Sequence, residues 1–223
     1  MFVGPTIATS TKARALARPF NLRRPVRRHD IERLVDAHGA REPPGIIAIV
    51  DGVFHDTLAV GHAEIRDAMR RGWIVWGLSS MGAIRAREMA HVGMRGFGDV
   101  FERFRATDDF RDDEVALLHE RAAPYRPVSE PLIHLRAAIA HLVSEKIVDG
   151  SDAHAVVSEL ESLWYGERTL RGTIRALAQR APRAAARIQD ELREVDRFRT
   201  KTKDLERFLE QRPFGPIAKG TPV

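Results

Sequence analysis

Hydrophobic residues in the first half of the chain form two short continuous runs, and a segment with helical periodicity follows each run. Both runs are rich in Ile, Val or Trp and are bounded by Gly, Pro, Asp or Ser, which is typical of strands buried on both faces. The predicted elements are a strand at 45–50, a helix at 59–69, a strand at 73–78 and a helix at 81–90. Strands that alternate with helices in this way predict βαβ units on a parallel sheet.

The second half of the chain carries only helical patterns. Helices are predicted at 132–143, 153–164 and 170–178, and a long last helix is predicted to start at Pro182 and to reach Leu209. Its apolar stripe either packs on the core of the chain or forms a coiled-coil-like surface for a partner, a second copy of the chain included.

These patterns predict an α/β fold, with an N-terminal Rossmann-like parallel sheet and its helices followed by an all-helical C-terminal region. We expect the α/β core domain at 1–125 and the helical region at 126–212. A flexible tail rich in Pro and Gly is expected at 213–223.

Composition narrows the class of protein. Hydrophobic residues make up 43% of the chain and charged residues 30%, as in ordinary globular proteins. The apolar runs are far shorter than the roughly 20 residues that span a bilayer, so we expect a soluble, cytoplasmic protein without a membrane partner. The chain has no cysteine, which excludes disulfides, thiolate metal sites and a persulfide carried by the protein.

Positive charge is concentrated at the N-terminus. The net charge is +5 and the pI is about 10.0, and residues 1–29 contain Lys and Arg but no acidic residue before Asp30. This segment is interpreted as a transit peptide or a nucleic-acid-binding arm, or as a first strand at 2–5 followed by a basic surface helix and loop. Beyond these arginines nothing favours a nucleic-acid partner, and none is expected.

Polar residues follow both predicted strands. In an open parallel sheet, ligands bind at the carboxyl ends of the strands. Asp51, Gly52 and His55 follow the first strand, and the sequence Ser79-Ser80-Met81-Gly82 follows the second. We therefore expect these residues to line one cleft.

Ser80 lies at a strand-to-helix turn, for which two interpretations stay open. The serine pair caps the helix, or Ser80 is placed as in a nucleophile elbow, with the N–H groups of Met81 and Gly82 free to stabilise an oxyanion. The full Gly-x-Ser-x-Gly pattern is absent because position 78 is leucine. A helix start at this position also suits a phosphate.

Asp51 and His55, together with His62 and Glu64, offer an acid/base set. The structural alternatives are a turn at Asp51-Gly52 and an exposed helix charge at Glu64. The spacing of these residues matches no standard metal site, so no metal is predicted.

Two further stretches each have both a functional and a structural interpretation. The acidic run 112–114 is either a third site cluster or the charged first turn of a helix. The glycines at 93, 96 and 98 form a loop that closes on the cleft or a tight connection, and no strand is predicted ahead of them as a dinucleotide fingerprint requires. No NAD and no other cofactor is expected.

A series of different short motifs lies between residues 3 and 116. They are Val3-Gly4-Pro5-Thr6, then Ile49-Val50-Asp51-Gly52-Val53-Phe54-His55, then Ala59-Val60 with His62 and Glu64-Ile65, then Ser79-Ser80-Met81-Gly82-Ala83 with Arg85-Ala86 and Glu88, then Gly93-Met94 with Gly96 and Gly98, and finally Asp112-Asp113-Glu114-Val115-Ala116. This series resembles the TfuA-like family, named after trifolitoxin biosynthesis. The chain departs from the family at Ile84, at Arg87 and in the missing glycine before Asp30, so no role is carried over to the loop at 24–30.

The resemblance implies that the protein works beside a YcaO-type ATP-dependent cyclodehydratase in the thioamidation of a ribosomal peptide backbone. It implies that the protein releases sulfide by hydrolysing a thiocarboxylated ubiquitin-like sulfur-carrier protein. The alternative is a non-catalytic adaptor or allosteric activator that brings YcaO and the carrier together.

As a mechanism, we expect Ser80 to attack the terminal carbonyl of the carrier or to position water, His55 to protonate the departing sulfide and Asp51 to orient His55. The residues expected to bind the substrate or its anion are Ser79, Met81, Gly82, Arg85, Gly52, Glu64, Glu88 and Asp113.

Overall fold

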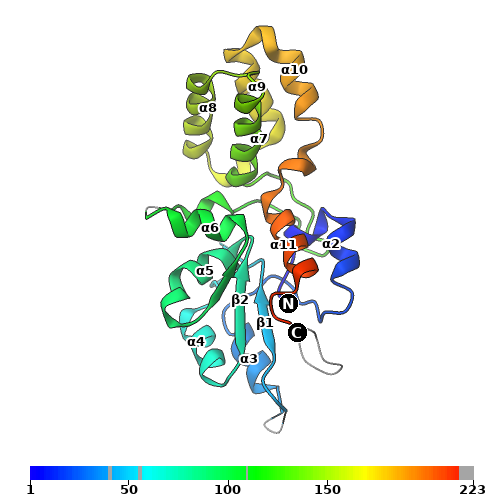
Figure 1. Cartoon of the computed structure of the whole chain (residues 1–223), viewed down its shortest axis with the longest axis vertical. Helices are drawn as coiled ribbons and strands as arrows, with labels where there is room; N and C mark the ends of the chain where they lie inside the picture. The colour runs from blue at the N-terminus through cyan, green and yellow to red at the C-terminus, as the bar shows by residue number, and fades with distance from the viewer. Residues whose placement is uncertain (40–41, 55–56, 109, 216–223) are drawn as a thin grey trace. The chain divides into compact units, whose positions relative to one another are not determined.

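The computed structural model describes residues 1–39, 42–54, 57–108 and 110–215 (Figure 1). The chain divides into two compact units, the first formed by residues 1–110 and 201–223 and the second by residues 111–200. The domain boundaries at 125 and 212 stay a prediction from the sequence.

A three-stranded parallel sheet lies in the first unit, which confirms the mixed α/β class. Its strands are β1 (Ile46–Ile49), β2 (Ile74–Leu78) and β3 (Arg95–Phe97), in the order β1-β2-β3. Ile47 pairs with Val75, and Gly77 pairs with Gly96. The predicted strands at 45–50 and 73–78 are therefore present.

Strand β3 was not predicted, because the glycine-spaced stretch around it was expected to be a loop or a connection. Three residues with a central glycine show no hydrophobic alternation. The structure gives that glycine a packing reason, since a Cβ atom at Gly96 would lie 2.2 Å from the ring of Phe101.

The N-terminal segment extends the pairing beyond β1. Phe2 forms parallel bridges with both Ile49 and Arg23, and Val26 forms one with Gly52. The strand predicted at 2–5 is reduced to the bridge at Phe2, because Pro5 begins a short helix instead. Met1, Phe2 and Val3 are buried, so the first three residues belong to the core, whereas the arginines that follow before residue 29 are exposed.

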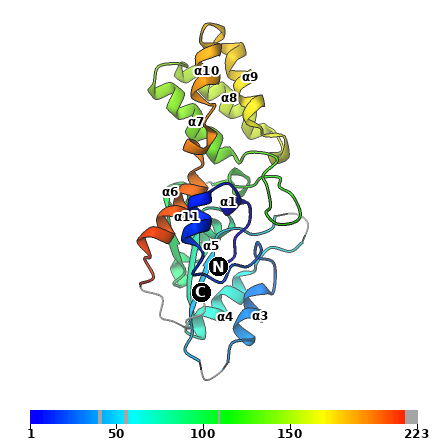
Figure 2. The ribbon, with the colours of Figure 1, turned by 90° about the vertical axis from the view of Figure 1, so that its right-hand side faces the viewer.

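Helices cover both faces of the sheet (Figures 1 and 2). Those of the first unit are α1 (Pro5–Ala8), α2 (Thr11–Leu16), α3 (Asp30–Asp36), α4 (His62–Arg70), α5 (Met81–Met89), α6 (Asp99–Ala106) and, except for its first residue, α11 (Thr200–Gln211), with a 3-10 turn at Ala90–Val92. Side chains of α11, such as Leu205 and Phe208, pack with Trp76 and Leu78 on one face. Helix α5 packs against all three strands on the opposite face.

The described residues of the second unit form helices and loops. The helices are α7 (Leu132–Ser144), α8 (Gly150–Ser162), α9 (Leu170–Arg180) and α10 (Ala185–Glu191), with 3-10 turns at Asp112–Glu114, Tyr165–Glu167, Pro182–Ala184 and Val195–Phe198. The guanidinium of Arg168 is fully buried and donates hydrogen bonds to the carbonyl oxygens of Leu160, Leu163 and Asp113. None of the helices in the described part of the chain is long and apolar enough to span a membrane.

The prediction of one long last helix from Pro182 was wrong. The segment is broken into a 3-10 turn, α10, a second 3-10 turn and α11. Ile188 and Phe198 lie in the core of the second unit, whereas Leu205 lies in the core of the first. The apolar residues that form one stripe in the sequence therefore belong to two separate cores, and the predicted helix is broken between them.

Candidate functional site at the carboxyl ends of the strands

Helix α5 starts directly on the sheet because three glycines permit a close approach. A Cβ atom at Gly82 would lie 1.7 Å from the carbonyl oxygen of Ile49, and one at Gly77 would lie 2.0 Å from the carbonyl oxygen of Gly82. A Cβ atom at Gly52 would lie 2.6 Å from the side chain of Met81. The first turn of α5 is thus pressed against the carboxyl ends of β1 and β2, as the strand-to-helix pattern predicts.

The turn between β2 and α5 is strained at Ser79. Ser79 has a φ of +63°, in the left-handed region that non-glycine residues rarely adopt, and the N–H of Ser80 donates to the carbonyl oxygen of Leu78 at 2.7 Å. The Ser79 hydroxyl is buried and donates to the carbonyl oxygen of Lys201 at 2.9 Å. Ser79 therefore anchors the turn to α11 through its hydroxyl.

Ser80 occupies the cap position of α5 without capping it. Its side chain makes no capping hydrogen bond, although the residue is 2% exposed, and its hydroxyl has no hydrogen-bond partner among the described residues. Its carbonyl oxygen accepts from the N–H of Ala83 at 2.9 Å. The capping interpretation of the Ser80 side chain is therefore not realised.

The N–H groups of Met81 and Gly82, which were expected to form an oxyanion hole, differ in whether they have a hydrogen-bond partner. The N–H of Gly82 donates to the carbonyl oxygen of Val50 at 3.3 Å, so it is engaged with the sheet. The N–H of Met81 has no partner among the described residues and belongs to the first turn of α5, where the helix dipole favours an anion. The anion-binding potential of this turn therefore centres on Met81 and Ser80.

Asp51 is committed to the N-terminal segment. Its carboxylate is 1% exposed and accepts hydrogen bonds from the N–H groups of Gly4 at 2.8 Å and Thr6 at 3.0 Å, and from the Thr6 hydroxyl at 2.6 Å. It thereby caps α1. His55, the residue that Asp51 was expected to orient, lies outside the described residues.

Glu64 is also a capping residue, and the interpretation as an exposed helix charge was wrong, since only 9% of it is exposed. One carboxylate oxygen accepts from the N–H of Gly61 at 2.8 Å and from the N–H of His29 at 3.1 Å. The other accepts from the N–H of Ile31 at 3.1 Å. One side chain thus serves the starts of both α3 and α4.

Arg85 and Glu88 form a cluster with His62 on the side of α5. The Nη1 atom of Arg85 lies 2.6 Å from Oε2 of Glu88, and Nε2 of His62 lies 2.8 Å from the same oxygen. The Nε atom of Arg85 donates to the carbonyl oxygen of Val60 at 3.0 Å. Arg85 therefore holds the end of the segment that joins β1 to α4, and its positive charge stays within the first two turns of α5.

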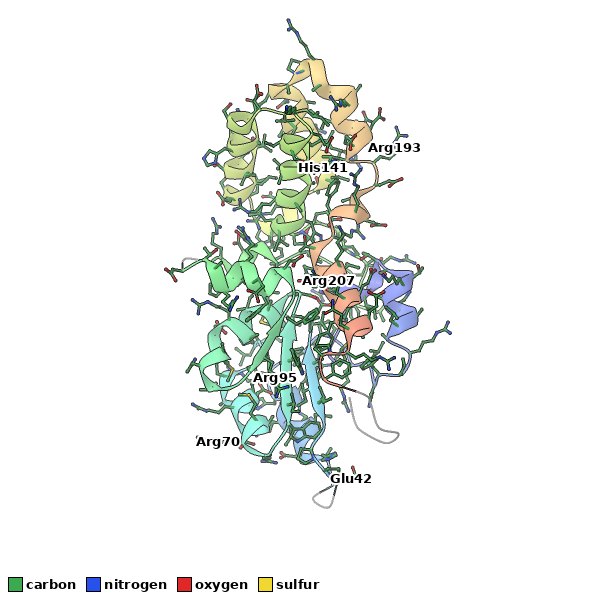
Figure 3. The ribbon with its side chains drawn as sticks, in the orientation of Figure 1. Glu42, Arg70, Arg95, His141, Arg193 and Arg207 are labelled. Carbon is green, nitrogen blue, oxygen red and sulfur yellow. The ribbon has the colours of Figure 1, made fainter. Side chains whose placement is uncertain are left out.

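Asp204 on α11 fills the start of α6. Its buried carboxylate accepts from the N–H groups of Asp99 at 2.8 Å and Val100 at 2.9 Å. It also pairs with Arg207. Arg207 is labelled on α11 in Figure 3. Burial raises the pKa of Asp204 to about 6, against the lowering effect of these hydrogen bonds. Neither Asp204 nor the Lys201 carbonyl was predicted from the sequence, because their partners lie more than a hundred residues away along the chain.

Among the helices that start in the first unit, α5 differs from all the others in the described part of the chain. Side-chain oxygens accept from the first N–H groups of α1 to α4 and α6; they come from Asp51, Ser10, Glu64 and Asp204. No side-chain oxygen of the described residues does so at α5. The start of α5 is therefore the one at which the described residues supply no side-chain acceptor.

Asp113, another predicted site residue, belongs to the second unit. Its carboxylate pairs with the buried Arg168 at 2.6 Å and with Arg111 at 3.1 Å. Burial opposes the charged form, but the hydrogen bonds from the two arginines outweigh it and lower the pKa of Asp113. In the described ranges, no group of three His, Cys, Asp or Glu residues is arranged to hold a metal ion.

Comparison with known families then bears on the role of this site. A family model described as TfuA-like protein matches residues 51–169, more than half of the chain. The chain belongs to the TfuA-like family. Membership implies a role in YcaO-associated thioamide biosynthesis. No curated protein matched the chain.

The TfuA-like match starts at Asp51 and includes the turn at Ser79 and Ser80. It extends beyond the stretch of resemblance noted in the sequence, through α7 and α8 to residue 169. The arginine-rich segment at 1–29 and helix α11 lie outside it.

Proposed function

We propose that this TfuA-like protein releases sulfide from a thiocarboxylated ubiquitin-like sulfur-carrier protein, for use by a YcaO-type ATP-dependent enzyme in peptide-backbone thioamidation. The observation that carries the proposal is the uncapped start of α5, where the Ser80 hydroxyl and the Met81 N–H lie at the carboxyl ends of β1 and β2. The TfuA-like family relationship and the parallel order of the strands support the same location.

A thiocarboxylate needs such a position for two reasons. It is a resonance-stabilised anion, so attack on its carbonyl carbon requires positive potential to stabilise the oxygen. The N-terminal end of α5 supplies an unpaired N–H and the positive end of the helix dipole. Asp204 at α6 illustrates the fit, because it places a carboxylate on two N–H groups of the neighbouring helix at 2.8 and 2.9 Å.

The proposed step balances without a cofactor. The Ser80 oxygen attacks the terminal carbonyl carbon of the carrier while its proton passes to His55, the carbon–sulfur bond breaks, and His55 returns that proton to the sulfur, which leaves as hydrosulfide. Water then hydrolyses the acyl-serine and leaves the carrier with an ordinary carboxylate. If water attacks directly, Ser80 positions it and the products are the same.

The other predicted residues act by position in this scheme. Asp51 fixes the Gly4–Thr6 turn, and Glu64 fixes the starts of α3 and α4. Arg85, held by Glu88, supplies positive charge one turn beyond Met81. The pairing of Asp51 with His55 stays a prediction, because His55 lies outside the described residues.

A mass spectrum of the thiocarboxylated carrier, before and after incubation with the protein alone, tests the proposal. We expect conversion of thiocarboxylate to carboxylate by the wild type, and a loss of about a hundredfold or more in rate for both Ser80→Ala and His55→Ala. Arg70→Gln, which alters an exposed residue at the far end of α4, is the matched control and keeps full activity. Wild-type rates in both site variants contradict the proposal.

The adaptor function is the second candidate, and one observation favours it. The carboxylates of Asp51, Glu64 and Glu88 are all engaged in hydrogen bonds that organise the fold. If the carrier stays thiocarboxylated with the protein alone but thioamidation by YcaO is faster when the protein is added, the adaptor function replaces hydrolysis.

A further inference from the structure

The arginine-rich N-terminal segment takes no part in the proposed hydrolysis, yet it builds a distinct feature of the first unit. A surface hollow of about 240 Å³ lies between residues 2, 23 and 24 and helix α3. It is lined by Arg23, Arg24, Arg33 and Asp30, with Phe2 and Leu34 as apolar neighbours. We propose that this arginine hollow binds a small anion that carries a phosphate or carboxylate group.

The arginine hollow has more positively charged than negatively charged residues in its lining. Asp30 accepts from Nη2 of Arg24 at 2.9 Å and from Nη1 of Arg33 at 3.2 Å. Arg23 has no ion-pair partner among the described residues. Three arginines and one carboxylate thus line the hollow, which leaves a net charge of +2 for an incoming anion.

The backbone holds the arginines in place. The N–H of Arg23 donates to the carbonyl oxygen of Met1 at 2.8 Å, and its carbonyl oxygen accepts from Val3 at 3.0 Å. Arg33 lies on α3, whose start is fixed by Glu64. Guanidinium groups on ordered backbone suit phosphate and carboxylate because they donate two parallel hydrogen bonds.

The size and lining of the hollow define the ligand class. A volume of about 240 Å³ is below the roughly 300–1,000 Å³ of sites for drug-sized ligands, so the anion is small. The one aromatic residue among its lining residues, Phe2, is 2% exposed and offers no surface on which a nucleic-acid base stacks. A small anion therefore fits better than a nucleic acid.

The experiment is a calorimetric titration of the full chain at constant ionic strength, with inorganic phosphate and with succinate as the two probes. We expect one of the probes to bind. Binding of phosphate alone identifies a phosphate-bearing ligand, and binding of succinate alone identifies a carboxylate. Failure of both to bind overturns the proposal.

Variants locate the binding in the hollow. We expect Arg23→Gln and Arg33→Gln each to weaken binding by about tenfold or more, and Arg33→Lys to restore only part of it. Arg18→Gln removes the same charge from an exposed residue outside the hollow and is expected to bind as the wild type does. Equal weakening by all three Gln variants overturns the proposal, because it shows a response to net charge alone.

A single-stranded oligonucleotide serves as a third probe. If it binds much more tightly than either small anion, and Arg23→Gln and Arg33→Gln abolish that binding, the segment is a nucleic-acid site and the small-anion proposal is wrong. Sulfide release is independent of these outcomes, because the hollow shares no residue with the start of α5.

Discussion

The starts of α5 and α6 are two versions of the same structural element. Each helix begins where a parallel strand ends, α5 after β2 and α6 after β3. At α6 the buried carboxylate of Asp204 accepts from two N–H groups, whereas at α5 no side-chain oxygen among the described residues accepts from the first turn. Among the described residues, a side chain thus fills the start of α6 and none fills the start of α5, which we call the open start.

The two helix starts are expected to have different roles, with the start of α6 contributing to stability and the start of α5 to function. A carboxylate built into a helix start stabilises the fold, and Asp51 and Glu64 do the same at other helices of this unit. An open start loses that stabilisation but keeps a donor for an external anion. Positive φ is found at both kinds of start, because Ser79 lies beside the start of α5 and His29, with a φ of +66°, lies at the cap position of α3, which Glu64 fills.

The largest expected effect comes from breaking the close approach that places α5 on the sheet. Gly82→Ala puts a Cβ atom 1.7 Å from the Ile49 carbonyl oxygen, so α5 must move. We expect the free energy of unfolding to fall by about 3 kcal/mol or more, measured by urea denaturation. Gly150→Ala, where a Cβ atom meets nothing within 4 Å, is the control and changes stability by less than about 1 kcal/mol. Similar values for the two variants contradict the packing argument.

The filled start of α6 predicts a pH effect. Because the pKa of Asp204 is raised to about 6, the folded state binds a proton more tightly than the unfolded state between its ordinary pKa of 3.8 and about 6. The contribution of Asp204 to stability is therefore greatest below pH 3.8 and is lost as the pH rises through about 6, by about 2 to 3 kcal/mol in all. Denaturation of the wild type and Asp204→Asn across this window measures it. A difference between the two that is independent of pH contradicts the assignment.

A smaller effect is expected at the strained turn. Ser79→Ala loses the hydrogen bond to the Lys201 carbonyl and keeps the positive φ, so stability falls by about 1 kcal/mol. Ser79→Gly loses the same bond but relieves the strain by about 1 kcal/mol, so it stays near the wild type. If the Gly variant is the less stable of the two, positive φ is not a source of strain here.

The smallest effect on stability is expected at Ser80 itself. Ser80 makes no capping bond, so Ser80→Ala changes the free energy of unfolding by less than about 0.5 kcal/mol. Ser10, whose hydroxyl accepts from the N–H of Ala13 at 2.9 Å, is the matched serine, and Ser10→Ala is expected to lose about 1 kcal/mol. Equal losses would show that Ser80 is a structural cap after all.

The sequence predicted those parts of the fold that have local causes. Apolar runs bounded by Gly, Pro or Asp identified β1 and β2, and the strand-to-helix turn at Ser80 identified the candidate site. Strand β3 was missed because three residues around Gly96 carry no periodic pattern. The single bridge at Phe2 was too short to be distinguished from a full strand.

The states of the site residues depend on contacts that periodicity does not reveal. Asp51 and Glu64 were assigned to chemistry because they follow a strand or start a helix, but apart from Gly61, which is three residues from Glu64, their partners lie 33 to 47 residues away along the chain. Asp204 was missed because it acts on a helix 104 residues away. In the sequence, Asp204 stands among the charged residues of α11 in the way of an ordinary acidic residue on a helix surface.

The most direct test of the open helix start is the amide signal of Met81 in a ¹⁵N–¹H NMR spectrum. On addition of a thiocarboxylated carrier to Ser80→Ala, which binds without turnover, we expect the Met81 N–H to shift downfield because it gains an anionic acceptor. The signals of Asp99 and Val100, already bonded to Asp204, are expected to stay in place. A carrier that binds while the Met81 signal does not move contradicts the proposal that the start of α5 holds the thiocarboxylate.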